Sequence, residues 1–280
     1  MSTTSVQSPS GIKVHAIRTG YVAVKPSHRK LSVFAPLRLP AILLDPRFTE
    51  WLPIYAWVIE HPEGIIVIDT GDTSRTADPD YYDCDPGSRF IYNRILKMSV
   101  KPEEEIGAQL PQLGIEPEEV RWVVQTHMHS DHMGGLGTFP EAKFVISLHD
   151  FAASRATLTC RIPEWLEPTH PAFEDGGPFG RGFALTEAGD VTVVPTPGHT
   201  RGHQSVIFED ELTYFFAGDT SFDEAQLEEG VVAGICEDVG SARSTLKCIR
   251  AFAETYPTVY LPSHDPYSGE RLAQRTVTRF

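Results

Sequence analysis

Long apolar runs and clusters of positive charge are both missing from this 280-residue sequence. No window of eighteen apolar residues occurs, so we expect no membrane-spanning helix. Lys and Arg number 24 against 38 Asp and Glu, which gives a net charge of -14, and no basic patch offsets it. Because a surface of this charge repels phosphate groups, we expect neither nucleic acid nor a membrane as a partner.

Cysteine is scarce as well, with four in the chain. Cys84, Cys160, Cys236 and Cys248 lie far apart and form no CxxC pair, which argues against a thiolate zinc site or a redox dithiol. We therefore expect buried, reduced thiols. The N-terminal MSTTSVQSPSG also lacks the basic start and apolar stretch of a secretory signal, so we predict a cytoplasmic protein with a disordered tail at 1–11.

The rest of the chain, 12–280, is predicted to form a single α/β domain. Apolar runs alternate with turn-forming and helix-forming stretches, which is typical of mixed sheets covered by helices. We expect a long loop at 25–50 and a surface excursion at 160–182. Strands are expected at 13–24, at 53–71 as a hairpin about HPEG, at 120–126, from 143, in three runs between 190 and 220, and at 258–265, and helices near 90–98, from 102 and at 241–257.

Candidate metal ligands crowd into one short stretch, THMHSDHMGG at 126–135. Zinc and similar divalent cations bind imidazole nitrogen and carboxylate oxygen at about 2.0 to 2.2 Å. His127 and His129 can point to one ion, whereas Asp131 and His132 can turn toward a second. The two glycines behind them, Gly134 and Gly135, permit a close backbone turn.

That loop alone leaves both ions short of ligands, and three later residues can complete them. His199, Asp219 and His264 each follow an apolar strand. Because a carboxylate has two oxygens, Asp219 can bridge two metals. The predicted ligands are His127, His129, His199 and Asp219 for one ion, and Asp131, His132, His264 and Asp219 for the other.

With these motifs in this order, the chain resembles the metallo-β-lactamase superfamily over roughly residues 50–265. The strand motif IVIDTG at 66–71 agrees with that resemblance. It implies a four-layer αββα sandwich, and it implies that Asp69 supports a metal ligand through a hydrogen bond. The other histidines, His203 included, have no such context and are expected to serve packing or the surface.

The resemblance and the ligand set together predict a dinuclear hydrolase. Two cations lower the pKa of a shared water toward about 7, and the resulting hydroxide can attack a carbonyl. Asp131 is placed to transfer a proton to the leaving oxygen. Zinc is the default metal, although iron, cobalt and manganese accept the same ligands.

Within the superfamily the chain is most similar to the N-acyl homoserine lactonases, which implies a small lactone substrate and a role in quorum quenching. One departure concerns Phe222, because that branch carries a tyrosine three residues after the bridging aspartate. A phenyl ring cannot donate the hydrogen bond that a tyrosine hydroxyl gives at the lactone carbonyl. Phe222 can instead line an apolar pocket for an acyl chain.

Other functions stay open at this point. TPGHTRGH and FFAGDTSF also resemble the glyoxalase II thioesterases, although no appended glutathione-binding segment is found. Other carboxylic ester hydrolases and phosphodiesterases of the superfamily are further alternatives, and a di-iron redox or sensor module is the non-enzymatic one. The apolar stretch at 31–44 could pack against a second copy in a homodimer or cap the cleft.

Overall fold

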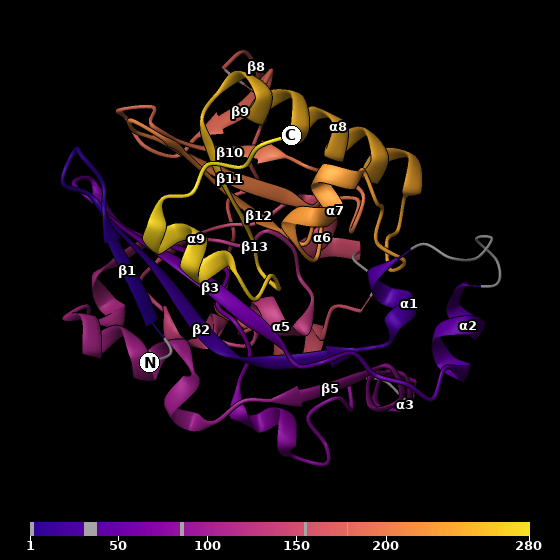
Figure 1. Ribbon diagram of the computed structural model, residues 1–280. Coiled ribbons are helices and arrows are strands. Elements are labelled where there is room, and N and C mark those ends of the chain that lie inside the picture. Colours follow the sequence, from indigo (N-terminus) through magenta and orange to yellow (C-terminus); the bar gives the residue numbers. More distant parts are fainter. Residues whose placement is uncertain (1–2, 31–37, 85–86, 154–155, 178) are drawn as a thin grey trace.

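The computed structural model describes residues 3–30, 38–84, 87–153, 156–177 and 179–280, whose strands form two sheets (Figure 1). The first sheet has the order β1-β2-β3-β4-β6-β7, and β5 pairs with β2. The second has the order β13-β12-β11-β10-β9-β8. The first comprises β1 (Thr3–Gln7), β2 (Lys13–Val24), β3 (Leu52–His61), β4 (Gly64–Ile68), β5 (Leu96–Ser99), β6 (Val120–Val124) and β7 (Lys143–Val145). The second comprises β8 (Glu174–Asp175), β9 (Arg181–Ala184), β10 (Val191–Pro195), β11 (Gln204–Glu209), β12 (Thr213–Gly218) and β13 (Thr258–Pro262).

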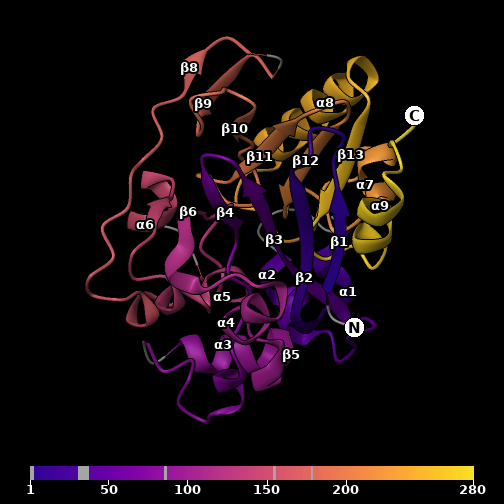
Figure 2. The ribbon, with the colours of Figure 1, turned by 90° about the vertical axis from the view of Figure 1, so that its left-hand side faces the viewer.

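Helices flank these sheets and occupy the loops between their strands (Figure 2). The α-helices are α1 (Pro26–Arg29), α2 (Arg38–Leu44), α3 (Ser88–Ile95), α4 (Ile106–Gln109), α5 (Ser130–Met133), α6 (Leu148–Ala153), α7 (Glu224–Glu229), α8 (Val239–Thr255) and α9 (Ser268–Gln274). Short 3₁₀ turns lie at Ser74–Ala77, Pro102–Glu104, Leu110–Leu113, Pro117–Glu119, Leu136–Thr138 and Thr159–Arg161. Among the described residues, the longest helix is too short and too polar to cross a bilayer.

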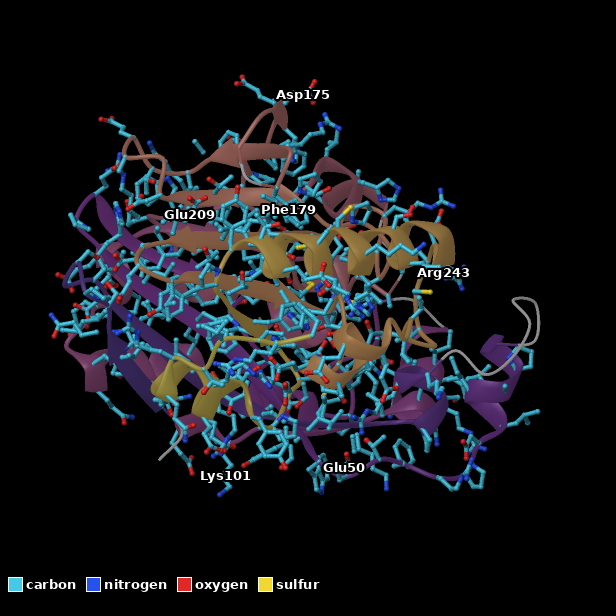
Figure 3. The ribbon with its side chains drawn as sticks, turned by 45° about the horizontal axis from the view of Figure 1, so that its top comes forward. Glu50, Lys101, Asp175, Phe179, Glu209 and Arg243 are labelled. Atoms are coloured by element: carbon cyan, nitrogen blue, oxygen red, sulfur yellow. A yellow bond between two sulfur atoms is a disulfide. The ribbon has the colours of Figure 1, made fainter. Side chains whose placement is uncertain are left out.

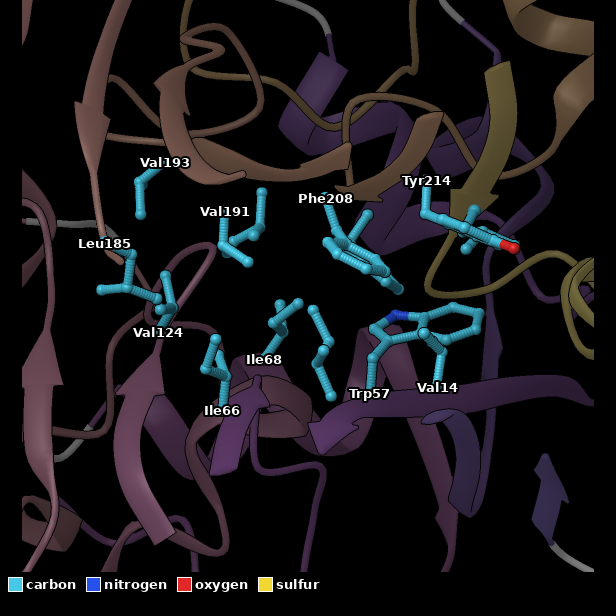
Figure 4. Packing of buried hydrophobic residues seen from close by; sticks show 14 of the residues in the cluster. Val14, Trp57, Ile66, Ile68, Val124, Leu185, Val191, Val193, Phe208 and Tyr214 are labelled. Atoms are coloured by element: carbon cyan, nitrogen blue, oxygen red, sulfur yellow. The ribbon is translucent and has the colours of Figure 1, made fainter. Parts of the chain in front are cut away.

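The main core lies between the two sheets, where alternate residues of each strand point inward. Figure 4 shows Ile66 and Ile68 of β4 facing Val191 and Phe208 of the second sheet. Trp57 of β3 is fully buried in the same layer, and its ring centroid lies 5.5 Å from that of Phe216. The side chains between these inward residues point to the opposite faces of the sheets, which therefore need their own cover.

Helix α8 covers the outer face of the second sheet. Its buried residues, among them Leu246, Ile249 and Phe252, recur at helical spacing and pack on Phe215 of β12. Phe179 extends this layer, with its ring centroid 5.7 Å from those of Phe215 and Phe252 (Figure 3). The outer face of the first sheet packs on the segment around α4, where Ile106 and Leu110 are buried. The result is the predicted four-layer αββα sandwich.

Local predictions held where the sequence pattern was strong. The hairpin about HPEG is β3 and β4, with His61 paired to Gly64, and the predicted C-terminal helix is α8. The strand predicted to begin at 143 is β7, which ends at Val145 and is followed by α6. Two predictions were wrong. Residues 3–7 of the expected tail form β1, which pairs antiparallel with β2. The loop at 25–50 contains α1 and α2, while part of the apolar stretch at 31–44, residues 31–37, lies outside the described residues.

The cysteines are also a correction. Cys84 and Cys160 form a disulfide, with their Cα atoms 5.3 Å apart, so the expectation of four reduced thiols was wrong. The two lie 76 residues apart in sequence, and nothing in that spacing signals the contact. Cys248 is exposed and Cys236 only half-buried, so the expected burial was wrong for these two as well.

Candidate metal centre

The predicted residues meet at one edge of the sandwich because the strands before them run in the same direction. In the first sheet β4 and β6 are parallel, so Asp69 and the loop at 126–135 emerge side by side. In the second sheet β12 and β13 are parallel, and β10 has the same direction through two antiparallel steps. His199, Asp219 and His264 follow these three strands and therefore reach the same edge.

Asp69 fixes the beginning of the histidine loop. It is fully buried and adopts a positive φ of 57°, which is uncommon for a residue with a side chain. Its Oδ1 accepts from the Thr126 amide at 2.7 Å, and its Oδ2 accepts from the Thr126 hydroxyl at 2.8 Å. Oδ2 also lies 2.8 Å from Nδ1 of His132. One carboxylate therefore sets both the path of the loop and the orientation of an imidazole.

Behind the histidines the backbone passes very close to a neighbouring segment. The amide of Gly134 donates to the Gly71 carbonyl at 2.8 Å. A Cβ on Gly134 would lie 2.7 Å from the Cα of Asp72, closer than real Cβ atoms come to backbone. This is the close turn that the two glycines predicted.

Three imidazole nitrogens converge on one side of the site. Nδ1 of His129 lies 3.0 Å from Nε2 of His127 and 2.9 Å from Nε2 of His199. An imidazole nitrogen carries either one proton or one lone pair, so Nδ1 of His129 can make a good hydrogen bond to only one of these two nitrogens. Such a triad instead fits the donor set of a shared divalent cation.

Asp219 stands between this triad and a second pair of imidazoles. Its Oδ2 lies 3.4 Å from Nε2 of His199 and 3.9 Å from Nε2 of His127. Its Oδ1 lies 3.3 Å from Nε2 of His132 and 3.4 Å from Nε2 of His264. The two oxygens of one carboxylate thus face two separate groups of nitrogens. We call these groups the Oδ2 side and the Oδ1 side.

Asp131 joins the Oδ1 side, where its Oδ2 lies 3.4 Å from Nε2 of His264. Two buried atoms on this side, Nε2 of His132 and Oδ1 of Asp219, have no hydrogen-bond partner among the described residues. Leaving buried polar atoms unsatisfied costs about 1 to 3 kcal/mol each. The donor chemistry and these two unsatisfied atoms both fit a bound cation.

The outward nitrogens of the imidazoles are held by protein groups. Nδ1 of His127 contacts the Thr126 hydroxyl at 3.0 Å. Nδ1 of His199 lies 3.2 Å from the Ile235 carbonyl, and Nδ1 of His264 lies 2.9 Å from the Pro53 carbonyl. Together with the contact of His132 to Asp69, these bonds direct the Nε2 atoms of these four imidazoles inward, as in the outer shell of metal sites, whereas His129 presents its Nδ1.

The pKa values of these groups differ between the two sides. Burial, and then the neighbouring imidazoles, hold the pKa values of His127 and His199 well below the usual range. Burial also acts to lower the pKa of His132, but the charges of Asp219, Asp69 and Asp131 outweigh it and raise that pKa well above its ordinary value.

The pKa of Asp219, the carboxylate between the two sides, is shifted by the same imidazoles. Burial acts to raise the pKa of Asp219, but His264, His132 and His199 hold it well below the usual carboxyl range. The Asp219 carboxylate therefore stays ionised between the two groups of imidazoles.

His203 is a residue whose part in this site the sequence prediction missed. Its Nε2 accepts from the backbone amide of Asp219 at 3.0 Å, and its Nδ1 donates to the Thr196 hydroxyl at 2.9 Å. Burial lowers the pKa of His203 to about 3, so the ring stays neutral and can accept that bond. The available signal was its place in TPGHTRGH, four residues after His199.

Phe222 lies beside the Oδ1 side. Its ring centroid is 5.8 Å from that of His264, and it packs in an apolar cluster with Ile54 and Leu52. It is 6% exposed, so only a small part of the ring reaches the surface of the site.

Comparison with known proteins identifies the family of this chain. The sequence profile described as the metallo-beta-lactamase superfamily matches residues 49–264. A probable metallo-hydrolase of Mycobacterium tuberculosis is 32% identical over 164 residues, which are 53% of this chain and 50% of that protein. The chain thus spans about half the length of that relative. The N-acyl homoserine lactonase AttM of Agrobacterium fabrum is 28% identical over 241 residues, covering 77% of this chain and 82% of that protein.

Solved structures with the same fold were also found. An N-acyl homoserine lactone hydrolase with N-hexanoyl-L-homoserine bound at its catalytic metal centre superposes with a TM-score of 0.73, at 19% identity over 96% of each chain. AidC, a dizinc quorum-quenching lactonase, superposes with a TM-score of 0.66, at 15% identity over 95% of this chain and 92% of its own. At these identities the likeness establishes the shared fold.

Proposed function

This chain belongs to the metallo-β-lactamase superfamily of metal-dependent hydrolases, and we propose that within it the chain is a lactonase that opens N-acyl homoserine lactones with the help of two divalent metal ions. The observation that carries the proposal is the position of Asp219, whose two oxygens face separate groups of imidazoles at 3.3 to 3.9 Å.

The two sides of Asp219 would each hold one cation. His127, His129 and His199 would hold the first, and Asp131, His132 and His264 the second, with Asp219 shared. When bound, such ions acidify water and polarise a carbonyl, which is the chemistry that hydrolysis of an ester or lactone needs at neutral pH. Zinc is the metal we propose, because nitrogen and carboxylate donors suit it.

The chain's own residues supply orientation and proton transfer. Asp69 holds His132 and the loop, and His203 holds the backbone of Asp219. Asp131, 9% exposed, is the carboxylate we assign to passing a proton to the leaving alkoxide oxygen as the ring opens. The exposed part of the Phe222 ring is the surface that we assign to the acyl chain.

The substrate class draws its support from the relatives. AttM is named as an N-acyl homoserine lactonase, and one solved neighbour that covers 96% of the chain is named as an N-acyl homoserine lactone hydrolase. A thioesterase is the second candidate carried by the sequence, and a direct competition between substrates separates the two.

The test uses purified protein loaded with two equivalents of zinc. We expect it to hydrolyse N-hexanoyl and N-decanoyl homoserine lactones faster than S-lactoylglutathione, simple γ-lactones and a phosphodiester, and metal analysis should return two ions per chain. Faster turnover of the thioester would favour the glyoxalase II alternative. Full activity with one ion per chain would contradict the two-metal assignment.

A further inference from the structure

His28 carries a buried hydrogen-bond donor without a partner. The side chain is 1% exposed, and its Nδ1 accepts from the Lys25 backbone amide at 3.2 Å. A neutral imidazole that accepts at Nδ1 carries its proton on Nε2. In the described part of the chain, that Nε2 has no hydrogen-bond partner. Such a donor is costly to bury unless something outside the protein uses it.

Helix α1, which carries His28, is fastened directly to the segment that orients His199. The His28 carbonyl accepts from the amides of Gly234 at 2.7 Å and Ile235 at 3.1 Å. The Ile235 carbonyl is in turn the partner of Nδ1 of His199 at 3.2 Å. A Cβ on Gly234 would overlap the Ser27 carbonyl, so only glycine allows this approach. His28 is therefore one backbone segment away from the Oδ2 side.

The same helix is also fastened to the turn that carries Phe222. The Gln226 side chain donates to the Arg29 carbonyl and accepts from the Phe222 amide at 2.9 Å. Arg29 adds an ion pair to Asp223. Figure 1 shows α1 next to α7 in agreement with these bonds. Because Phe222 in turn lies beside His264, α1 is connected to both sides of the centre.

The local charges keep His28 neutral. Burial, and then the electrostatic influence of Lys25 and His129, lower the pKa of His28 to about 3. At neutral pH the ring therefore presents an N–H group and no positive charge, and Phe222 offers no donor nearby.

We propose that Nε2–H of His28 donates a hydrogen bond to a carbonyl oxygen of the substrate held at the centre. This inference rests on the proposed hydrolase function and assigns one of its substrate contacts. The bond would help to place a carbonyl-containing substrate, and a bond to the scissile carbonyl would strengthen as negative charge develops on the oxygen.

Two matched substitutions separate the donor from the structural role of His28. His28→Gln keeps a donor near the position of Nε2, whereas His28→Asn keeps only the acceptor that caps the Lys25 amide. With the substrate that the wild-type protein hydrolyses fastest, we expect kcat/KM to fall about 10- to 100-fold in His28→Asn and to recover substantially in His28→Gln. Equal kcat/KM values in the two variants, whether reduced or unchanged, would overturn the proposal.

A histidine buried elsewhere provides the control. His15 is 3% exposed and has both ring nitrogens satisfied, by Ser5 and Glu60. His15→Asn should lower thermal stability while leaving kcat/KM and metal content unchanged. All variants are first shown to bind as much metal as the wild-type protein, so that a lost ligand is not mistaken for a lost donor.

A readout independent of turnover completes the test. In protein labelled with ¹⁵N histidine, the Nε2 resonance of His28 should shift when the hydrolysis product of the chosen substrate binds, with Nε2 protonated throughout. An unchanged resonance at saturation would overturn the inference. If the chosen substrate is a thioester, the lactonase proposal fails while the same comparison still tests His28.

Discussion

The two sides of Asp219 contain the same kind of residue in equally buried positions, and yet the pKa values of their imidazoles are shifted in opposite directions. On the Oδ2 side the pKa values of His127 and His199 are depressed, whereas on the Oδ1 side those of His132 and His264 are raised. The Oδ1 side has two further carboxylates, Asp69 and Asp131. The number of carboxylates that face an imidazole, rather than its burial, therefore decides the direction of its pKa shift here.

The largest effect is expected from removing Asp219, which contacts both sides. We expect Asp219→Ala to lose both ions and to reduce kcat/KM by about 1000-fold or more. Each side loses an oxygen ligand, and the carboxylate that lies between the two ions is removed. Metal analysis and lactone hydrolysis measure both effects. Two tightly bound ions in this variant would disprove the bridging role.

Two single variants, each lacking one imidazole on a different side, should show whether the two sides bind metal independently. We expect His129→Ala and His264→Ala each to retain one ion per chain and to lose about 100-fold or more in activity. The retained ion should be on the opposite side in the two proteins, which X-ray absorption at the metal edge can distinguish by the share of carboxylate oxygen. Identical spectra would mean that the two sides do not bind independently.

A smaller effect is expected one bond away from the ligands. Asp69→Asn removes the charge that faces Nδ1 of His132, so metal affinity on the Oδ1 side should fall about 10- to 100-fold. Asp190→Asn is the matched control, because Asp190 makes a similar contact of 3.0 Å to His61, the last residue of β3, which is not a candidate metal ligand. That control should change thermal stability only. Equal metal affinity in the two variants would remove the assigned role of Asp69.

The smallest expected effect is in the pH dependence of metal binding. An imidazole with a raised pKa still holds a proton that the metal must displace, whereas one with a lowered pKa is already free of it. As the pH falls, binding on the Oδ1 side should therefore weaken first. Equilibrium dialysis should show His129→Ala, which keeps that side, losing its ion at a higher pH than His264→Ala. The reverse order would contradict the difference in pKa.

Much of this site could be predicted from sequence because its chemistry is local. Four candidate ligands lie within 127–132, and the three others follow apolar runs that are long enough to identify as strands. Strand direction then carries all seven residues to one edge. The two-residue spacing of His127 and His129 fits their convergence, and adjacent Asp131 and His132 do turn toward the other side.

The contributions of His28 and His203 could not be predicted, since both depend on long-range packing. His203 acts on a backbone amide sixteen residues away. His28 lies in a stretch without periodicity that was predicted to be a loop, and its significance depends on an unsatisfied atom that no sequence pattern reports. For the same reason β1 and the disulfide were missed, because each is a contact between segments and not a property of either one.

The bond between Cys84 and Cys160 closes the chain into a covalent ring, and the whole loop at 126–135 lies inside it. A protease that cuts once within this ring produces two polypeptides that still migrate as one molecule until a reductant is added. After a cut between the loop and Cys160, the four candidate ligands of the loop would stay tethered, through sulfur, to the part of the chain that carries His199, Asp219 and His264.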